Sequence, residues 1–252
     1  MMISGHIFKV KMVILQMGRW SKRVDWIVVK NYYIGFILYL ITLLFLKAPY
    51  EVDIQNNPTL YISNHLYLYT QYVPAVFATL FVSLLFEETY NKTTREFLLT
   101  CPIRIRHIIG GRYLKISIMI HAPLTILLLY AASKINQNIL QCCVLNEITE
   151  IPILQVHPLT LIVQNFVVIN FFVILTLFLL LIFQEKSIPL TLVLAYCALE
   201  FGPMSRILGD FCVFRGAFSL PDYYHMFVPN IIFLLVLSII LFVVMYFSYK
   251  IR

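Results

Sequence analysis

The segment EETYNKTTREFLLTCPIRIRHIIGGRYLK, from Glu87 to Lys115, places a dense block of charged residues between two apolar runs. Each run is long enough to cross a bilayer, whose hydrocarbon core of roughly 30 Å requires about 20 apolar helical residues. The segment contains an acidic pair, threonines, a Leu pair, a proline and four arginines, which is more than a simple connection needs. We expect it to be a cytoplasmic loop that another protein binds.

The composition is that of a membrane protein. Of the 252 residues, 61% are hydrophobic and only 12% are charged, and the mean hydropathy is +0.86, whereas soluble domains carry about 25% charged residues. Lipid leaves no partner for free backbone groups, so the spans must be helical. The sequence therefore predicts an all-α integral membrane protein with one transmembrane domain, residues 1–252. Six spans are expected, at residues 27–46, 67–86, 113–132, 158–183, 188–208 and 229–249.

The lysines and arginines predict the orientation, because positive charge near span ends is retained in the cytoplasm. With both termini inside, 15 of the 19 lie on the cytoplasmic side, and only Lys47, Lys134, Arg206 and Arg215 lie outside. The same asymmetry accounts for the net charge of +7 without a nucleic-acid partner. We expect a multi-pass protein of the plasma membrane, of bacterial type, with both termini cytoplasmic.

Residues 1–25 are too charged to span and lack the cleavage site of a signal peptide. Ile7, Val10, Ile14 and Met17 recur at helical spacing among basic residues, which is typical of a helix lying in the inner headgroup layer. The alternative is a disordered basic tail. We favour the interfacial elbow helix.

The five cysteines form no CxxC motif and no Cys/His cluster with metal-ligand spacing, so no metal site is predicted. Cys142 and Cys143 are expected in the second outer loop and Cys212 in the third. A disulfide from this pair to Cys212 is conceivable, but free thiols are favoured.

Catalytic motifs are weak. Glu87-Glu88 followed by Lys92 approximates the EExxxR of membrane-embedded prenyl-protein peptidases, but Lys replaces Arg and the histidines do not follow that pattern, so an intramembrane peptidase is a remote alternative. HExxH, GxSxG and the phosphate-binding GxxxxGK[ST] are all missing from the sequence. We expect no enzyme activity and no cofactor in this chain, and any ATP-driven motion would need a partner.

The segment from Thr93 to Pro102, followed by Arg104-Ile105-Arg106 and Gly111-Arg112, resembles the loop between the second and third spans of ABC-2 type transporter permeases. The family pattern runs from acidic residues through Gly-Thr, Glu, Leu-Leu and Pro to basic residues and Gly-Lys. This sequence has Thr93 in place of the Gly and Arg112 in place of the Lys. The number of spans, the inner termini and the interfacial helix also fit that family.

The resemblance implies that this loop is a coupling helix that docks on an ABC ATPase, which binds ATP and Mg. Two such ATPase subunits and a second permease copy, in a homodimer, are the expected partners within the lipid membrane. The implied function is ATP-driven export of an amphipathic or hydrophobic cargo, with a peptide of the phenol-soluble modulin or bacteriocin type favoured over a lipid-linked glycan or drug-like molecule. A non-transporting membrane anchor or sensor is the rival from another class. The coupling residues would be Glu87, Glu88, Thr93, Thr94, Arg95, Glu96, Phe97, Leu98, Leu99, Pro102, Arg104 and Arg106.

The residues of the loop support a short helix independently. Thr93 or Thr94 can cap its start and Pro102 would end it. Phe97, Leu98 and Leu99 would form one apolar knob that fits a groove on a partner.

Polar residues within spans are the second place to look for function, because an uncompensated ion in a bilayer is costly. Glu200 precedes Gly202-Pro203, where the helix should break, and re-entrant or capping helices should fill residues 203–228 as in the family. Glu200 is either part of an external gate or, as we favour, paired with Arg206 or Arg215 to stabilise the turn. His121 could face a conduit, but a neutral histidine bonded to a neighbouring helix is favoured.

Tyr61, Tyr67, Tyr69 and Tyr72 gather at the outer end of the second span. An interfacial aromatic belt is the favoured explanation, and stacking on sugars or an emerging peptide is the alternative.

Overall fold

The computed structural model describes residues 26–27, 29–47, 50, 52–55, 59–62, 66, 68–90, 105–145, 156–201, 213–214 and 224–251. A helix at Val29–Phe45 comes first, followed by strands β1 (Val52–Gln55) and β2 (Thr59–Ile62) and a short π-helix, η2 (Leu68–Tyr72). The remaining helices are α3 (Val73–Tyr90), α5 (Ile105–Leu145), α6 (Pro158–Phe183), α7 (Ser187–Phe201) and α9 (Tyr224–Ile251).

The described chain is predominantly helical, as predicted. Four helical stretches are long and apolar enough to cross a membrane, namely Tyr69–Phe86, Gly110–Leu145, Pro158–Phe183 and Val228–Met245. The two other predicted spans, residues 27–46 and 188–208, coincide with shorter apolar helices at Val29–Phe45 and Ser187–Glu200.

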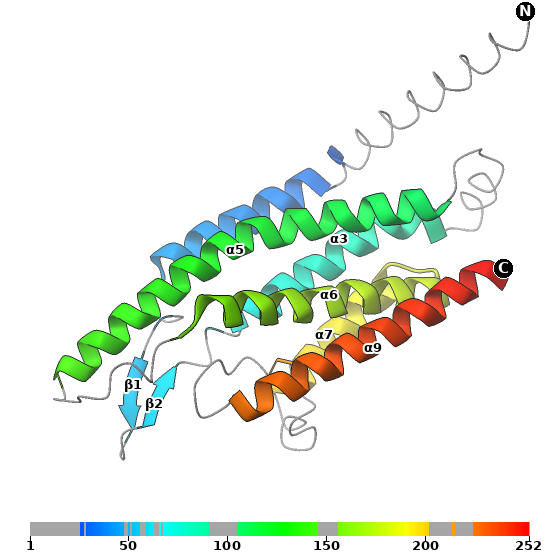
Figure 1. The fold of residues 1–252 in the computed structure, drawn as a ribbon. Helices are drawn as coiled ribbons and strands as arrows, with labels where there is room; N and C mark the ends of the chain where they lie inside the picture. The colour runs from blue at the N-terminus through cyan, green and yellow to red at the C-terminus, as the bar shows by residue number, and fades with distance from the viewer. Residues whose placement is uncertain are drawn as a thin grey trace, which may run out of the picture.

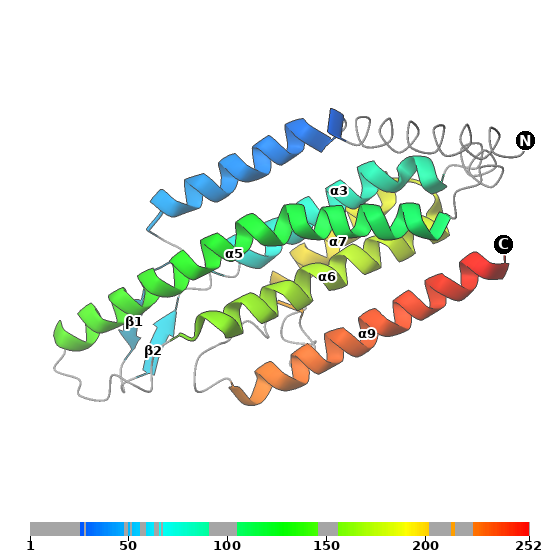
Figure 2. The ribbon, with the colours of Figure 1, turned by 45° about the horizontal axis from the view of Figure 1, so that its top comes forward.

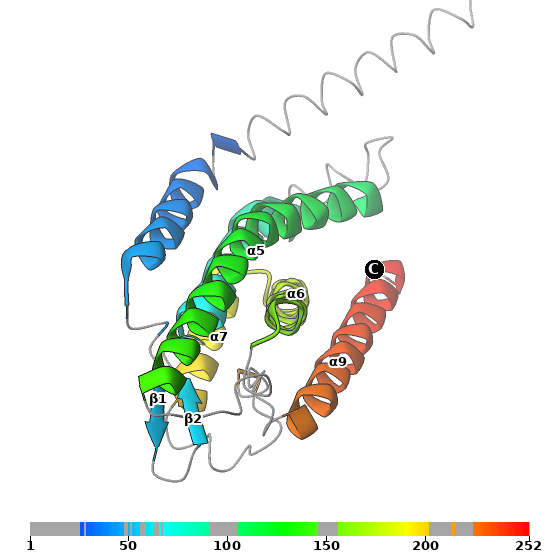
Figure 3. The same cartoon turned by 60° about the vertical axis from the view of Figure 1, so that its left-hand side comes forward.

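Successive helices alternate in direction, so that α3, α6 and α9 run one way and α5 and α7 the other (Figures 1 and 2). Figure 3, which looks nearly along α6, shows α5 and α9 on either side of it. More than half of the residues of α6 are buried, and it contacts α3, α5, α7 and α9. It is therefore the central helix of the bundle.

Two apolar clusters form the core. The larger joins helix Val29–Phe45, α3, α5 and one side of α6, and aromatic rings hold it together where Phe36 meets Phe77 and Phe81. The smaller lies between α3, α7, α9 and the other side of α6, and Phe172 stacks there on Phe214 at a centroid distance of 5.4 Å.

The turn from α6 to α7 is tight. Gln184 adopts a left-handed conformation with a φ of 56°, and its N–H donates to the carbonyl of Leu180. This caps the helix end, and α7 starts at Ser187 beside its antiparallel neighbour.

Helix α5 is much longer than the expected span at residues 113–132, because it starts at Ile105 and continues to Leu145. The extension carries a buried stripe of Ile135, Ile139 and Cys143 at four-residue spacing, which favours continued helix. Cys142 and Cys143 therefore lie on α5 and not in an outer loop, which corrects that expectation. Among the described residues, Cys143 and Cys197 are free thiols, and Cys212 lies outside them.

Two asparagine side chains on this extension form hydrogen bonds with backbone groups of other segments. The Asn136 side chain pairs with both backbone groups of Val156 at 2.8 and 3.1 Å, and Asn138 donates to the carbonyl of Tyr50 at 2.6 Å. These bonds fix the C-terminal end of α5 to the segments at Tyr50 and Val156.

Besides the helices, the described residues include one short hairpin that the sequence did not predict, in which β1 and β2 pair antiparallel, with Val52 opposite Ile62 and Gln55 opposite Thr59. Both segments alternate in polarity, a pattern that favours strands and is too short for a span. The hairpin connects helix Val29–Phe45 to η2.

Other expectations concern residues outside the described ones, namely the elbow helix at 1–25, the coupling segment at 91–104 and most of 202–223. Helix α9 starts at Tyr224, five residues before the expected start at Pro229. Pro229 therefore lies inside the helix, where it has no N–H to donate to the carbonyl of His225.

Candidate functional site

The two ends of the predicted coupling loop lie on described helices. Glu87 and Glu88 are in the last turn of α3, and Arg106 is in the first turn of α5. Thr93, Thr94, Arg95, Glu96, Phe97, Leu98, Leu99, Pro102 and Arg104 lie outside the described residues.

One hydrogen bond links these two helices near the loop. The Nη1 of Arg112 on α5 donates to the carbonyl of Leu85 on α3 at 2.6 Å. A charged donor makes a stronger bond than a neutral one. The sequence predicted Arg112 only as part of the basic stretch leading into the third span, so its role as a tether between the helices was missed.

Within the bundle, His121 and Tyr113 on α5 both contact Asn170 on α6. The Tyr113 hydroxyl donates to Asn170 Oδ1 at 2.8 Å, and Asn170 Nδ2 lies 3.1 Å from His121 Nε2. Asn170 Nδ2 also donates to the carbonyl of Phe166 at 2.8 Å, which fixes the orientation of the amide. Since Nδ2 is a donor, His121 Nε2 must accept, and this requires the neutral imidazole. His121 on α5 is thus bonded to the neighbouring helix α6.

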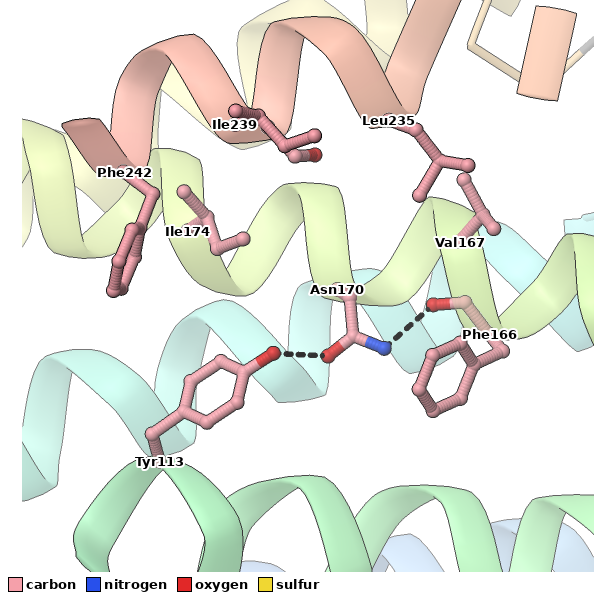
Figure 4. Close-up of a pocket in the computed structure, with 9 residues that line it drawn as sticks. Tyr113, Phe166, Val167, Asn170, Ile174, Leu235, Ile239 and Phe242 are labelled. Atoms are coloured by element: carbon pink, nitrogen blue, oxygen red, sulfur yellow. Dashed lines mark hydrogen bonds between the residues drawn. The ribbon is translucent and has the colours of Figure 1, made fainter. Parts of the chain in front are cut away.

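This network borders a groove between α5, α6 and α9 (Figure 4). The groove has a volume of about 260 Å³. The Tyr113 hydroxyl points across it toward Asn170, while Leu235 and Ile239 of α9 face Val167 and Ile174 of α6 (Figure 4). Its lining residues are Tyr113, Phe166, Val167, Asn170, Ile174, Leu235, Ser238, Ile239 and Phe242.

The lining makes the groove amphipathic. Ile239 and Phe242 are more than half exposed, whereas Asn170 and Ser238 are buried. A molecule with an apolar body and a few polar groups matches such a surface, because polar groups that enter lipid need hydrogen-bond partners.

Glu200 is buried near the end of α7. Its Oε1 accepts the backbone N–H of Phe214 at 2.6 Å, which joins the end of the helix to the segment beyond it. This contact gives Glu200 a turn-stabilising role through a backbone amide. Its expected partners Arg206 and Arg215 lie outside the described residues, as does the gate that they would form.

The tyrosines that were predicted to form an aromatic belt are distributed over several elements. Tyr61 is on β2, Tyr69 and Tyr72 are in η2, and Tyr67 is outside the described residues. The ring of Tyr72 packs on Phe214 with centroids 6.0 Å apart, and the carbonyl of Tyr69 accepts the Tyr39 hydroxyl at 2.7 Å. Tyr72 thus faces the protein interior and not only the membrane surface.

Sequence reasoning missed a set of buried carboxamides and hydroxyls. The signal was present, since Gln164-Asn165 and Asn170 interrupt the most apolar run of the chain. In addition to Glu200, the polar residues that are buried in the described part of the chain are Thr70, Gln71, Thr79, Ser83, Gln164, Asn165, Asn170, Thr176, Asn230 and Ser238.

Among the described residues, no group of three or more His, Cys, Asp or Glu is placed to hold a metal ion. No family model matches this chain, and neither a curated protein nor a solved structure matches it.

Proposed function

We propose that the chain is the transmembrane permease subunit of an ATP-driven exporter, in which a separate nucleotide-binding subunit hydrolyses ATP. The observation that carries this proposal is the loop between α3 and α5. Its sequence resembles the coupling loop of ABC-2 type permeases, and the helices at its two ends are bonded to each other through Arg112 and the carbonyl of Leu85.

The bond matters for coupling because a loop can move two helices together only if they are connected near it. A partner ATPase biases the spans by the difference in its affinity for their alternative arrangements. With α3 and α5 tethered at the loop, force applied there would reach both helices. Helix α3 contacts α6 and α7, and α6 contacts α9, so the motion has a packed route through the bundle.

The cargo that we propose is an amphipathic or hydrophobic molecule, with a peptide preferred. The groove between α5, α6 and α9 supports this class, because it combines exposed apolar side chains with the Tyr113–Asn170 pair. The six-span layout with both termini in the cytoplasm is part of the same proposal. It is supported by the distribution of lysine and arginine and by the alternating direction of the helices.

The test is co-purification with the candidate ATPase, followed by ATP turnover in lipid with and without amphipathic peptide. The informative variant is Arg112→Met, which removes the donor to Leu85 and should weaken peptide stimulation of ATP turnover. Lys115→Met is the matched control, because it removes one positive charge three residues further along α5. If the two variants have equal effects, Arg112 contributes only the positive charge that keeps this loop in the cytoplasm, and its bond to Leu85 has no part in coupling.

Two other outcomes would overturn the function itself. Failure of the intact chain to bind the ATPase would remove the coupling loop from the argument. Binding with ATP turnover that no candidate cargo changes would favour a membrane anchor or sensor.

A further inference from the structure

Two glutamines inside the bundle are fully buried. Gln71 lies in the π-helix η2 and Gln164 in the second turn of α6, and both side chains have an exposure of 0%. Within the described structure, neither the amide nitrogen nor the amide oxygen of either side chain has a hydrogen-bond partner.

The two glutamines lie toward the same end of the bundle. The Thr176 hydroxyl on α6 donates to the Thr79 hydroxyl on the parallel helix α3 at 3.3 Å, so these two residues lie at the same height along the bundle axis. Gln71 lies eight residues and Gln164 twelve residues from that level in the same direction, or roughly 12 and 18 Å at 1.5 Å per residue. The glutamines are thus about one helical turn apart in height, on elements that contact each other.

Two further polar residues lie at this end. Asn230 is in the early part of α9 and Glu200 is near the end of the antiparallel α7, and both are buried. Each lies about one turn beyond a member of the smaller apolar cluster, since Leu234 follows Asn230 and Cys197 precedes Glu200. Four neighbouring elements therefore bring polar side chains to the same end of one apolar cluster.

This arrangement is unfavourable as packing alone. A buried amide without hydrogen bonds is destabilising, and leucine of similar size would fill the same space without that cost. The backbone at Gln71 is also irregular, because Pro74 has no N–H to donate to the carbonyl of Thr70 and a π-helix precedes it. The burial of these two side-chain amides is explained if a second arrangement of the helices gives them hydrogen-bond partners.

We propose that Gln71 and Gln164 form a binding site for the amide groups of a peptide, closed in this structure and open in a second arrangement of the helices that the chain reaches without its ATPase. A carboxamide offers a donor and an acceptor side by side, as a peptide group does. Val168, one turn along α6 from Gln164, belongs to the smaller apolar cluster, and Tyr72, next to Gln71, packs against it, which suits apolar side chains of a peptide beside those amides. This inference depends on the proposed function and names the part of the cargo that the outer end of the bundle recognises.

The first test measures access to the two positions by a small hydrophilic thiol reagent. Gln71→Cys and Gln164→Cys are made in a chain whose five native cysteines are replaced by serine, in membrane fragments that the reagent reaches from both sides. Thr79→Cys, deeper in α3 and equally buried, is the matched control. A synthetic amphipathic Leu/Lys peptide and a maltooligosaccharide are added in separate arms.

We expect both cysteines to react at least about tenfold faster than the Thr79→Cys control, because an opening that costs 1.4 kcal/mol less is populated tenfold more. The peptide should slow the reaction and the oligosaccharide should not. Reaction no faster than the control would show that the site does not open and would overturn the proposal. Protection by the oligosaccharide alone would assign the site to glycans, and protection by neither would leave a water-filled vestibule, so that each contradicts a peptide site.

The second test separates binding from packing. Gln71→Leu and Gln164→Leu should leave the thermal midpoint unchanged or higher, because each removes unpaired polar atoms, yet peptide-stimulated ATP turnover should fall about tenfold as hydrogen bonds to cargo are lost. Thr79→Val, which removes a hydroxyl already bonded to the Ala75 carbonyl, should keep that stimulation. Full stimulation in both leucine variants would overturn the site. The thiol test needs no ATPase, so its result stands even if the proposed coupling fails.

Discussion

Polar contacts between α5 and α6 within the membrane-crossing part converge on Asn170. Asn170→Leu would leave the Tyr113 hydroxyl and His121 Nε2 without their shared partner. A fully buried group left unpaired costs about 1 to 3 kcal/mol, and Tyr113 and His121 are partly buried, so we expect a fall in the thermal midpoint in detergent that corresponds to the lower part of this range for each group. Combining this change with Tyr113→Phe should cost less than the sum of the two, because both remove the same bond.

Asn136→Leu provides the control for that cycle. Asn136 bonds to Val156 at the other end of α5, so its effect should add to that of Tyr113→Phe. Additivity in both pairs would contradict the shared network at Asn170.

Tyr50 allows a prediction about pH at a group outside the spans. Its hydroxyl donates to the carbonyl of Leu43 at 2.8 Å, and burial, with a smaller effect of Tyr130, raises its pKa to about 12. The neutral phenol is therefore stabilised by folding, and its contribution is complete below the unfolded pKa of 10 and is lost as the pH rises toward 12. The difference in thermal midpoint between wild type and Tyr50→Phe should be constant below pH 10 and shrink above it. A constant difference up to pH 12 would contradict a raised pKa.

Single residues were predicted from the sequence to different degrees. For His121 the sequence favoured a partner on a neighbouring helix, because a lone histidine in an apolar run needs a partner and a neighbouring helix is the usual source. The role of Glu200 at the turn was anticipated from Gly202-Pro203, but its bond to Phe214 was not, because a contact between residues 14 apart depends on how the chain folds back. Gln71 and Gln164 were missed because periodicity describes which face is apolar and says little about a polar side chain buried on that face.

At the scale of elements, the sequence predicted where the apolar helices lie more accurately than where they end. Residues 158–183 were predicted with the observed bounds, since Pro158 starts the helix and charged residues follow Phe183. Helix α5 exceeded its predicted span because its C-terminal part packs on protein through Ile135, Ile139 and Cys143 and bonds to protein through Asn136 and Asn138. Strands β1 and β2 were missed because four-residue alternation is a weak signal beside spans of about 20 residues.

The coupling segment carries the prediction that belongs to this scale. Leu98→Ala together with Leu99→Ala should strongly weaken ATPase binding, because truncating a buried leucine costs roughly 2 to 5 kcal/mol. Glu96→Lys should do so by reversing a charge at the same surface. Ile126→Leu, at a position on α5 that is 70% exposed to the surroundings, is the control and should bind normally. Pull-down of the ATPase decides the matter, and normal binding by the coupling variants would refute this segment as the docking element.

For the whole molecule, the alternating helices make the topology testable. We expect Cys101 to be cytoplasmic and the outer end of α5, with Cys142 and Cys143, to face the other side. Cys143 is fully buried, so Cys142 is the thiol that an impermeant maleimide should reach in intact cells. Labelling of Cys101 while Cys142 is protected would reverse the orientation.

The proposed coupling role of the loop also predicts how the chain assembles. Each chain contributes one such loop, between α3 and α5, whereas an ATPase pair that closes around ATP presents two docking surfaces. Two copies of this chain should therefore join two ATPase subunits with two-fold symmetry, the commonest arrangement of soluble oligomers. Native mass spectrometry of the complex in lipid or detergent should give equal numbers of permease and ATPase. The variant with Leu98→Ala and Leu99→Ala should keep the permease pair and lose both ATPases, because it alters the docking loop and leaves the helix faces intact. A stable complex with one ATPase for two permeases would contradict this symmetry, since the second loop would then have no partner to drive it.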